Sequence, residues 1–136
     1  MNRIDQRRNV RANISNQALF YRETPDGRRI EFEGTIKNIS QTGVYFEATT
    51  PKAIDVCKDL RQGDKLSFVF VDDYELYGKE HTAVIQDDAY IVRSSTTNEI
   101  VKLGCEIKLR SRDIENYIKD KEVTDFLNFH KTSLPF

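Results

Sequence analysis

The chain has 136 residues, 38% of them hydrophobic and 32% charged, and its 21 Lys and Arg against 22 Asp and Glu give a net charge of -1. This length and composition predict one soluble globular domain over residues 1–136, and the near-neutral charge argues against nucleic acid as a partner. The longest apolar run, around Phe68 to Val71, is far shorter than the roughly 20 residues that span a bilayer. We therefore expect a cytoplasmic protein without membrane insertion.

Arginines are concentrated at the start of the chain, where Arg3, Arg7, Arg8 and Arg11 fall within the first eleven residues. No apolar run follows them, so the segment lacks the pattern of a signal peptide. We expect residues 1–12 to form an arginine-rich N-terminal arm of the mature protein.

Apolar and polar residues then alternate along most of the chain, the pattern of half-buried strands. Turn signals separate the runs, including Pro25-Asp26-Gly27, Ser40 to Gly43 and Leu60 to Asp64. The region 79–96 is either a hairpin or one long strand bent by a bulge. The other expected strands are Asn16–Glu23, Arg29–Ile39, Val44–Ala48, Lys65–Asp72 and Asn98–Leu109.

The period of the apolar residues changes to three and four after residue 109, from Ile114 to Leu127. This predicts a C-terminal amphipathic helix over 111–130, or two short helices offset near Lys121, with Ser111 or Asp113 as the cap. The fold class is mainly β: five to seven antiparallel strands, with a helix that covers one open edge or mouth of the sheet.

The sequence contains no recognisable catalytic or metal site. His81 and His130 have no nucleophile or ligand spacing near them, and no Walker loop, dinucleotide fingerprint or EF-hand loop is present. We interpret the acidic pairs Asp72-Asp73 and Asp87-Asp88 as solvated turn residues at strand ends. The sequence therefore predicts no enzyme, no metal site and no cofactor.

The two cysteines belong to no Cys-x-x-Cys pair, which argues against a disulfide framework or a zinc site. Cys105 lies in a strand-like run, and we expect it to be a small buried residue.

Two short motifs remain as candidates for binding. The first is the spacing Arg7-x-x-x-Arg11, with Arg8 between. The guanidinium forks of these arginines could pair with phosphate oxygens or with the O6 and N7 acceptors of guanine. In Asn38-x-Ser40-x-x-Gly43, the amide and the hydroxyl share one face of a strand, and the glycine permits a tight turn or close backbone approach. Interpretations without a ligand stay open: the arginines can be a solvated arm, and the second motif can be an ordinary hairpin connection.

Together the motifs resemble the PilZ domain family, in which Arg-x-x-x-Arg precedes the first strand and Asp/Asn-x-Ser-x-x-Gly follows the second. The hydrophobic run Leu103–Ile107 before the final helix fits the same pattern. The resemblance implies a small antiparallel β-barrel of about six strands over 13–109, and a bacterial receptor for cyclic diguanylate (c-di-GMP). Asn in place of the commoner Asp, and Cys105 in place of a β-branched residue, are modest departures.

The resemblance also implies the site residues. Arg7 and Arg11 would contact guanine edges and phosphates, Arg8 would be an auxiliary phosphate partner, and Asn38, Ser40 and Gly43 would form the barrel-face part of the pocket. Arg3 with Arg7 has the same spacing but lies farther from the first strand.

Ligand binding would order the arm and create a surface for a downstream protein partner controlling motility, exopolysaccharide or pili. One alternative is a PilZ-like protein-interaction module that does not depend on the nucleotide. Another is a small barrel that binds single-stranded nucleic acid by Arg and Tyr stacking, which the acidic balance disfavours.

Overall fold

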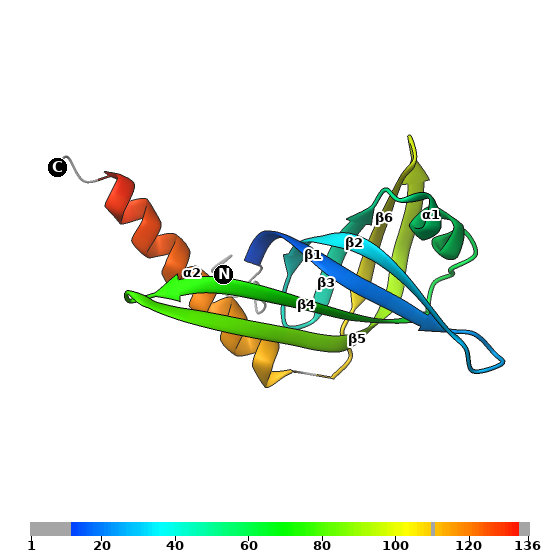
Figure 1. Cartoon of the computed structure of the whole chain (residues 1–136), viewed down its shortest axis with the longest axis horizontal. Coiled ribbons are helices and arrows are strands. Elements are labelled where there is room, and N and C mark those ends of the chain that lie inside the picture. The colour runs from blue at the N-terminus through cyan, green and yellow to red at the C-terminus, as the bar shows by residue number, and fades with distance from the viewer. Residues whose placement is uncertain (1–11, 110, 134–136) are drawn as a thin grey trace, which may run out of the picture.

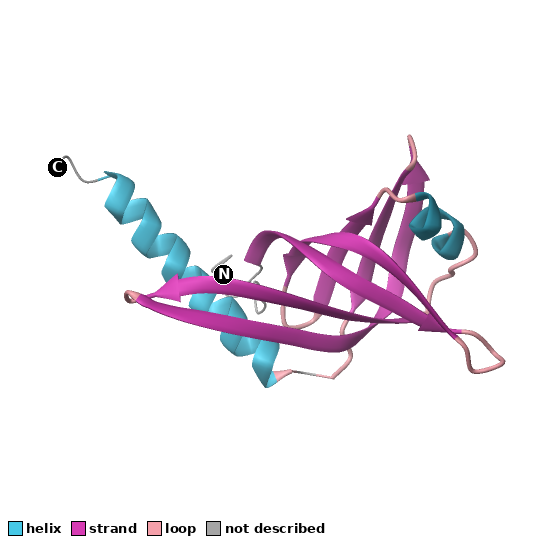
Figure 2. Cartoon of the chain, in the orientation of Figure 1, coloured by secondary structure: helices cyan, strands magenta, loops and turns pink. Residues whose placement is uncertain are grey.

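The computed structural model describes residues 12–109 and 111–133, with side chains as far as Asp125. Six antiparallel strands follow one another around a closed barrel in the order β1-β2-β3-β6-β5-β4 (Figures 1 and 2). The prediction of a mainly β chain of about six strands with a C-terminal helix is confirmed. The elements are β1 (Ala12–Glu23), β2 (Arg29–Ile39), β3 (Gly43–Ala48), α1 (Pro51–Cys57), β4 (Lys65–Leu76), β5 (Lys79–Thr97), β6 (Ile100–Glu106) and α2 (Arg112–Ser133).

An aromatic cluster fills the barrel interior. Phe20 stacks on Phe46 with ring centroids 3.8 Å apart, and Phe32 and Phe68 pack around this pair. All four rings are buried because every second residue of a strand points to the same face. The pairing of Phe20 with Phe68 also joins β1 to β4 and closes the barrel. All four rings lie on strands that the alternation in the sequence predicted.

The β4–β5 hairpin is longer than the sequence predicted. β4 continues past Asp72 to Leu76, and the turn at Tyr77 and Gly78 has φ of 52° and 77°, the left-handed geometry of a two-residue hairpin loop. β5 then runs without interruption from Lys79 to Thr97. Of the two alternatives for this region, the single long strand is right, and the register shift between Ile91 and Arg93 is its bulge.

The acidic pairs do not lie in turns, and their interpretation as solvated turn residues was wrong. Asp72 and Asp73 pair with residues of β5, and Asp87 and Asp88 pair with residues of β4, all within the hairpin ladder. Partners explain how the strands accommodate them: Asp88 accepts a 2.6 Å hydrogen bond from the hydroxyl of Ser67. A carboxylate can stay inside a strand when another element supplies its donor.

The short helix α1 was not predicted. The hydroxyl of Thr50 caps it by accepting a hydrogen bond from the backbone N–H of Ala53 at 3.1 Å, and Pro51 occupies the first turn. Arg22 of β1 holds the other end, because its guanidinium donates to the carbonyl of Val56 at 3.0 Å and to Asp59 at 2.8 Å. α1 contacts β2 and β6.

The C-terminal helix α2 is one continuous helix, and the hydroxyl of Ser111 accepts from the backbone N–H of Ile114 at 3.3 Å. Its buried side chains, Ile114, Tyr117 and Ile118, face the barrel, and the helix lies beside the β4–β5 hairpin (Figure 1). Ser111 is thus the cap, and of the two alternatives the single helix is right. No helix in the described part of the chain combines the length and the apolar character needed to cross a bilayer.

Candidate functional site

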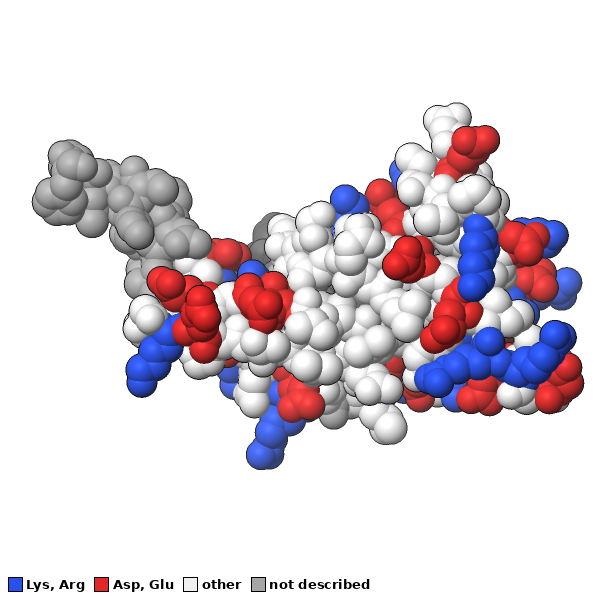
Figure 3. Space-filling view, in the orientation of Figure 1, with Lys and Arg blue, Asp and Glu red and all other residues white. Residues whose placement is uncertain are grey.

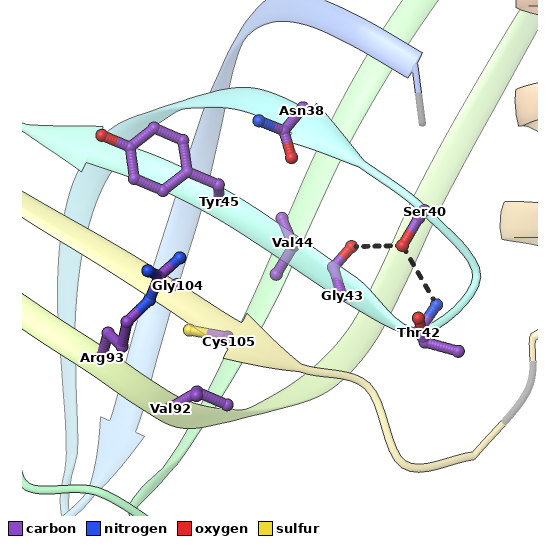
Figure 4. Close-up of a pocket in the computed structure, with 10 residues that line it drawn as sticks. All are labelled: Asn38, Ser40, Thr42, Gly43, Val44, Tyr45, Val92, Arg93, Gly104 and Cys105. Atoms are coloured by element: carbon purple, nitrogen blue, oxygen red, sulfur yellow. Dashed lines mark hydrogen bonds between the residues drawn. The ribbon is translucent and has the colours of Figure 1, made fainter. Parts of the chain in front are cut away.

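A hollow of about 470 Å³ lies where β3, β6 and β5 meet the loop between β2 and β3 (Figure 4). Three residues of the sequence motif, Asn38, Ser40 and Gly43, line it together. The structure therefore brings the described half of the predicted site into one place. The remaining lining residues are Thr42, Val44, Tyr45, Val92, Arg93, Gly104 and Cys105.

Four of the lining residues form a row across the strands. Asn38 pairs with Tyr45, Tyr45 pairs with Gly104, and Gly104 pairs with Arg93. Because neighbouring strands lie about 4.8 Å apart, this row spans about 14 Å. The hollow thus presents an amide, a phenol, a bare stretch of backbone and a guanidinium in sequence across the sheet.

Ser40 and Gly43 build the loop at one end of the hollow. The hydroxyl of Ser40 donates to the carbonyl of Gly43 at 3.5 Å and accepts from the N–H of Thr42 at 3.3 Å (Figure 4). The backbone N–H of Ser40 donates to the same carbonyl at 2.8 Å. A Cβ on Gly43 would lie 3.0 Å from the carbonyl oxygen of Cys105, so the glycine permits close approach of β6. The hairpin-connection interpretation of this motif is therefore correct for these two residues, which also line the hollow.

Asn38 differs from Ser40 because its side chain has no bonding role in the described structure. It lies at a register shift between β2 and β3 and is half-buried. Among the described residues, none forms a hydrogen bond with its amide, and that amide borders the hollow (Figure 4). A free amide carries both donors and an acceptor, so Asn38 is available to a ligand.

Tyr45 and Arg93 were not predicted as site residues. The hydroxyl of Tyr45 donates to the Glu47 carboxylate at 2.8 Å, and burial together with this bond raises the pKa of Tyr45. The positive charge of Arg93 acts in the opposite direction and lowers the pKa of Tyr45. The phenol is therefore neutral at physiological pH, and its ring is held in place beside the hollow.

The arginine part of the predicted site, Arg7, Arg8 and Arg11, lies outside the described residues. The first described residue, Ala12, pairs with Ile39, which stands between Asn38 and Ser40 in the sequence. The described chain therefore begins beside the hollow.

No His, Asp or Glu side chain lines this hollow among the described residues. Within residues 12–109 and 111–133, no three His, Cys, Asp or Glu side chains gather as metal ligands would. His81 stacks on Tyr74 in the β4–β5 hairpin, with ring centroids 5.6 Å apart. Burial raises the pKa of Cys105 to about 12, so this thiol is a buried neutral group, as the sequence predicted.

The fold is shared with solved structures of two bacterial proteins. The inhibitor of motility MotI/DgrA of Bacillus subtilis superposes with a TM-score of 0.55 at 16% identity, over 96% of this chain and 53% of that one. MrkH of K. pneumonia superposes with a TM-score of 0.53 at 19% identity as its c-di-GMP complex, and with 0.52 at 21% in its apo state. Each MrkH match covers 92% of this chain and 53% of MrkH.

The chain thus spans about half the length of each of these proteins. No protein-family model and no curated protein sequence matches it. At these identities the likeness is one of fold, and it supports the PilZ-like barrel that the sequence motifs predict.

Proposed function

We propose that this chain is a non-enzymatic receptor for cyclic diguanylate, with a PilZ-type site made of Arg7, Arg8 and Arg11 together with Asn38, Ser40 and Gly43. One observation carries the proposal: the Asn-x-Ser-x-x-Gly residues converge on a surface hollow in which the Asn38 amide is free among the described residues. The fold adds support, because MrkH has been solved as a c-di-GMP complex on a similar barrel.

The two halves of the site would divide the ligand between them. Asn38 and the loop of Ser40 and Gly43 supply neutral hydrogen-bonding groups, which suit base and ribose edges. Arg7 and Arg11 would supply forks for guanine edges and phosphates, with Arg8 as a further phosphate partner. The arginines directly precede Ala12, which pairs beside Asn38 and Ser40 in β2.

Binding would work as a switch because the arm and the barrel face hold the same ligand. Fixing each arm residue costs about 1 to 2 kcal/mol of conformational entropy, which the phosphate and guanine contacts would have to offset. The bound arm would then present a surface to a downstream protein partner that controls an output such as motility, exopolysaccharide or pili.

Isothermal titration calorimetry with c-di-GMP tests the receptor proposal. We expect saturable binding to the wild type and a loss of about tenfold or more in Asn38→Ala, since its hydrogen bonds to a buried ligand would be removed. Gln17→Ala, which removes an exposed amide on β1 outside the hollow, is the control and should bind as the wild type does. Equal affinity in Asn38→Ala and Gln17→Ala would show that the hollow is not the site.

A second candidate function, a protein-interaction surface independent of the nucleotide, rests on an apolar patch. Val71 and Val84 are cross-strand partners on β4 and β5, 55% and 58% exposed, and Leu19 on β1 is 37% exposed. Much of the middle of the face shown in Figure 3 is uncharged, with a few acidic side chains within it. Exposed apolar side chains that lie together favour protein contacts.

Capture of partners from lysate by immobilised protein, with and without c-di-GMP, separates the two functions. The switch predicts that partner recovery changes with the nucleotide. If partner recovery is the same with and without c-di-GMP but is lost in a Val71→Thr, Val84→Thr double variant, the result would favour the interaction module instead.

A further inference from the structure

We propose that Tyr45, Gly104 and Arg93 form a subsite for one guanine base of the dinucleotide, and that Arg93 selects guanine. This inference rests on the proposed receptor function and extends it. None of the three belongs to the Arg-x-x-x-Arg or Asn-x-Ser-x-x-Gly motifs. They continue the row that begins at Asn38, on the strands β3, β6 and β5.

Gly104 makes a recess that folding does not require. Its φ is not in the left-handed region, and a Cβ placed there would meet only the Arg93 side chain, Nε at 3.8 Å and Nη2 at 3.9 Å. Glycine inside a strand weakens the strand and often marks a place where a ligand approaches the backbone. Backbone conformation therefore does not require a glycine at position 104; its missing side chain leaves the strand open to the Arg93 guanidinium and to a ligand.

Tyr45 and Arg93 come from the strands on either side of Gly104, and the Arg93 side chain reaches over it (Figure 4). Each is one strand away from Gly104, so their Cα atoms are about 10 Å apart, twice the usual strand spacing. The Tyr45 hydroxyl is held by Glu47, which fixes the ring. The Tyr45 ring therefore borders the bare backbone of Gly104 on one side, and the Arg93 guanidinium lies over that backbone from the other side.

Arg93 is available to a ligand. The bulge at Val92 sets its register, so that Arg93 rather than Val92 faces Gly104, and bulges commonly re-aim a side chain in this way. The guanidinium of Arg93 has no ion-pair or hydrogen-bond partner within the described residues, whereas Arg22 binds Asp59 at 2.8 Å. A planar fork with free donors beside an aromatic wall suits a planar acceptor.

The lining favours a base over a phosphate. The Tyr45 ring and Val92, which is 46% exposed, give the hollow apolar walls that match the faces of a purine rather than a hydrated phosphate. Guanine offers O6 and N7 as a pair of acceptors to an arginine fork, whereas adenine replaces O6 with an amino donor. Arg93 would therefore distinguish guanine from adenine.

The experiment measures the affinities of c-di-GMP and of cyclic diadenylate (c-di-AMP) for wild type, Arg93→Ala, Gly104→Val and Asn38→Ala by calorimetry. Arg29→Ala is the matched control, because Arg29 is an arginine on a strand near a tyrosine, 3.7 Å from the ring centroid of Tyr21, at the other end of β2. We expect Arg93→Ala to weaken c-di-GMP binding about ten- to a hundredfold and to leave c-di-AMP binding unchanged. Arg29→Ala should bind both as the wild type does.

Gly104→Val tests the recess itself. The melting temperature should stay the same or rise, because valine suits a strand and its Cβ would lie at ordinary contact distance, 3.8 Å, from the Arg93 side chain, while c-di-GMP affinity falls at least tenfold. Wild-type affinity and selectivity in both Arg93→Ala and Gly104→Val, with binding weakened in Asn38→Ala, would overturn the subsite and leave the receptor function standing. Absence of c-di-GMP binding to the wild type would overturn both. Should Gly104→Val fail to fold, the selectivity of Arg93→Ala decides.

Discussion

Tyr117 attaches α2 to the barrel by packing against it and by a hydrogen bond. Its ring is 2% exposed and packs edge-on against Phe70, with centroids 5.6 Å apart and the planes at 73°. Its hydroxyl donates to the carboxylate of Asp72 at 2.8 Å, and Lys121 lies 3.4 Å from the same carboxylate. Replacing Tyr117 therefore removes either one bond or a whole buried ring.

The two replacements differ in expected magnitude. A hydrogen bond to a charged group contributes about 1.5 to 3 kcal/mol, and Tyr117→Phe should fall near about 1.5 kcal/mol because Asp72 keeps Lys121. Tyr117→Ala also leaves a cavity and should cost about 3 to 5 kcal/mol.

Urea unfolding followed by circular dichroism measures both losses. With a slope of about 1 to 3 kcal/mol per molar urea, Tyr117→Phe should lower the midpoint by about 0.5 to 1.5 M at constant slope. Tyr77→Phe is the control, because Tyr77 is 73% exposed at the tip of the β4–β5 hairpin. A free energy of unfolding for Tyr117→Ala equal to that of Tyr77→Phe would refute the conclusion that α2 is packed on the barrel through this side chain.

Three further predictions concern stability and thiol chemistry. Burial, with a hydrogen bond to Asp120, raises the pKa of Tyr74 to about 12. The neutral phenol therefore stabilises the fold fully below about pH 10, and this stabilisation is lost as pH rises toward 12. The variant Tyr74→Phe should flatten the alkaline fall in melting temperature, and a pH profile unchanged from the wild type would contradict this. Cys57 and Cys105 are each 6% exposed with pKa raised to about 12, so Ellman's reagent should label them slowly in the folded protein and completely in urea; rapid native labelling would count against this burial. Arg22→Ala should destabilise the protein by about 1 kcal/mol, measured by urea unfolding, because α1 loses its link to β1; a value near zero would show that α1 holds without it.

Strands and core were predictable because alternation records which residues point inward. Phe20, Phe32, Phe46 and Phe68 each occupy an inward position of a predicted strand, and all four are buried. The short helix α1 could also have been found. Thr50 followed by Pro51 is a capping residue followed by a proline that suits the first turn.

The errors had a common physical cause. Asp72 and Asp73 looked like turn residues because carboxylates usually remain in water, but the donors to Asp72 come from Tyr117 and Lys121, far along the chain on α2. A local pattern carries no information about such a partner. The solvent-facing interpretation therefore failed where tertiary contacts supply the missing donors.

The same limit applies to the candidate site. Asn38, Ser40 and Gly43 could be selected because they form a contiguous motif. Arg93 could not, because its place opposite Gly104 depends on a bulge that shifts the register of β5 by one residue. The only local signal was a glycine inside a strand-like run at position 104.

The central claim, that this barrel is a receptor for cyclic diguanylate, is tested most directly by calorimetric titration of the complete chain with c-di-GMP, alongside the Arg7→Ala, Arg11→Ala double variant. We predict saturable binding to the wild type that weakens as salt is raised, and a loss of at least tenfold in the double variant, since charged hydrogen bonds to the ligand would be removed. No heat of binding to the wild type at high micromolar ligand would contradict the claim.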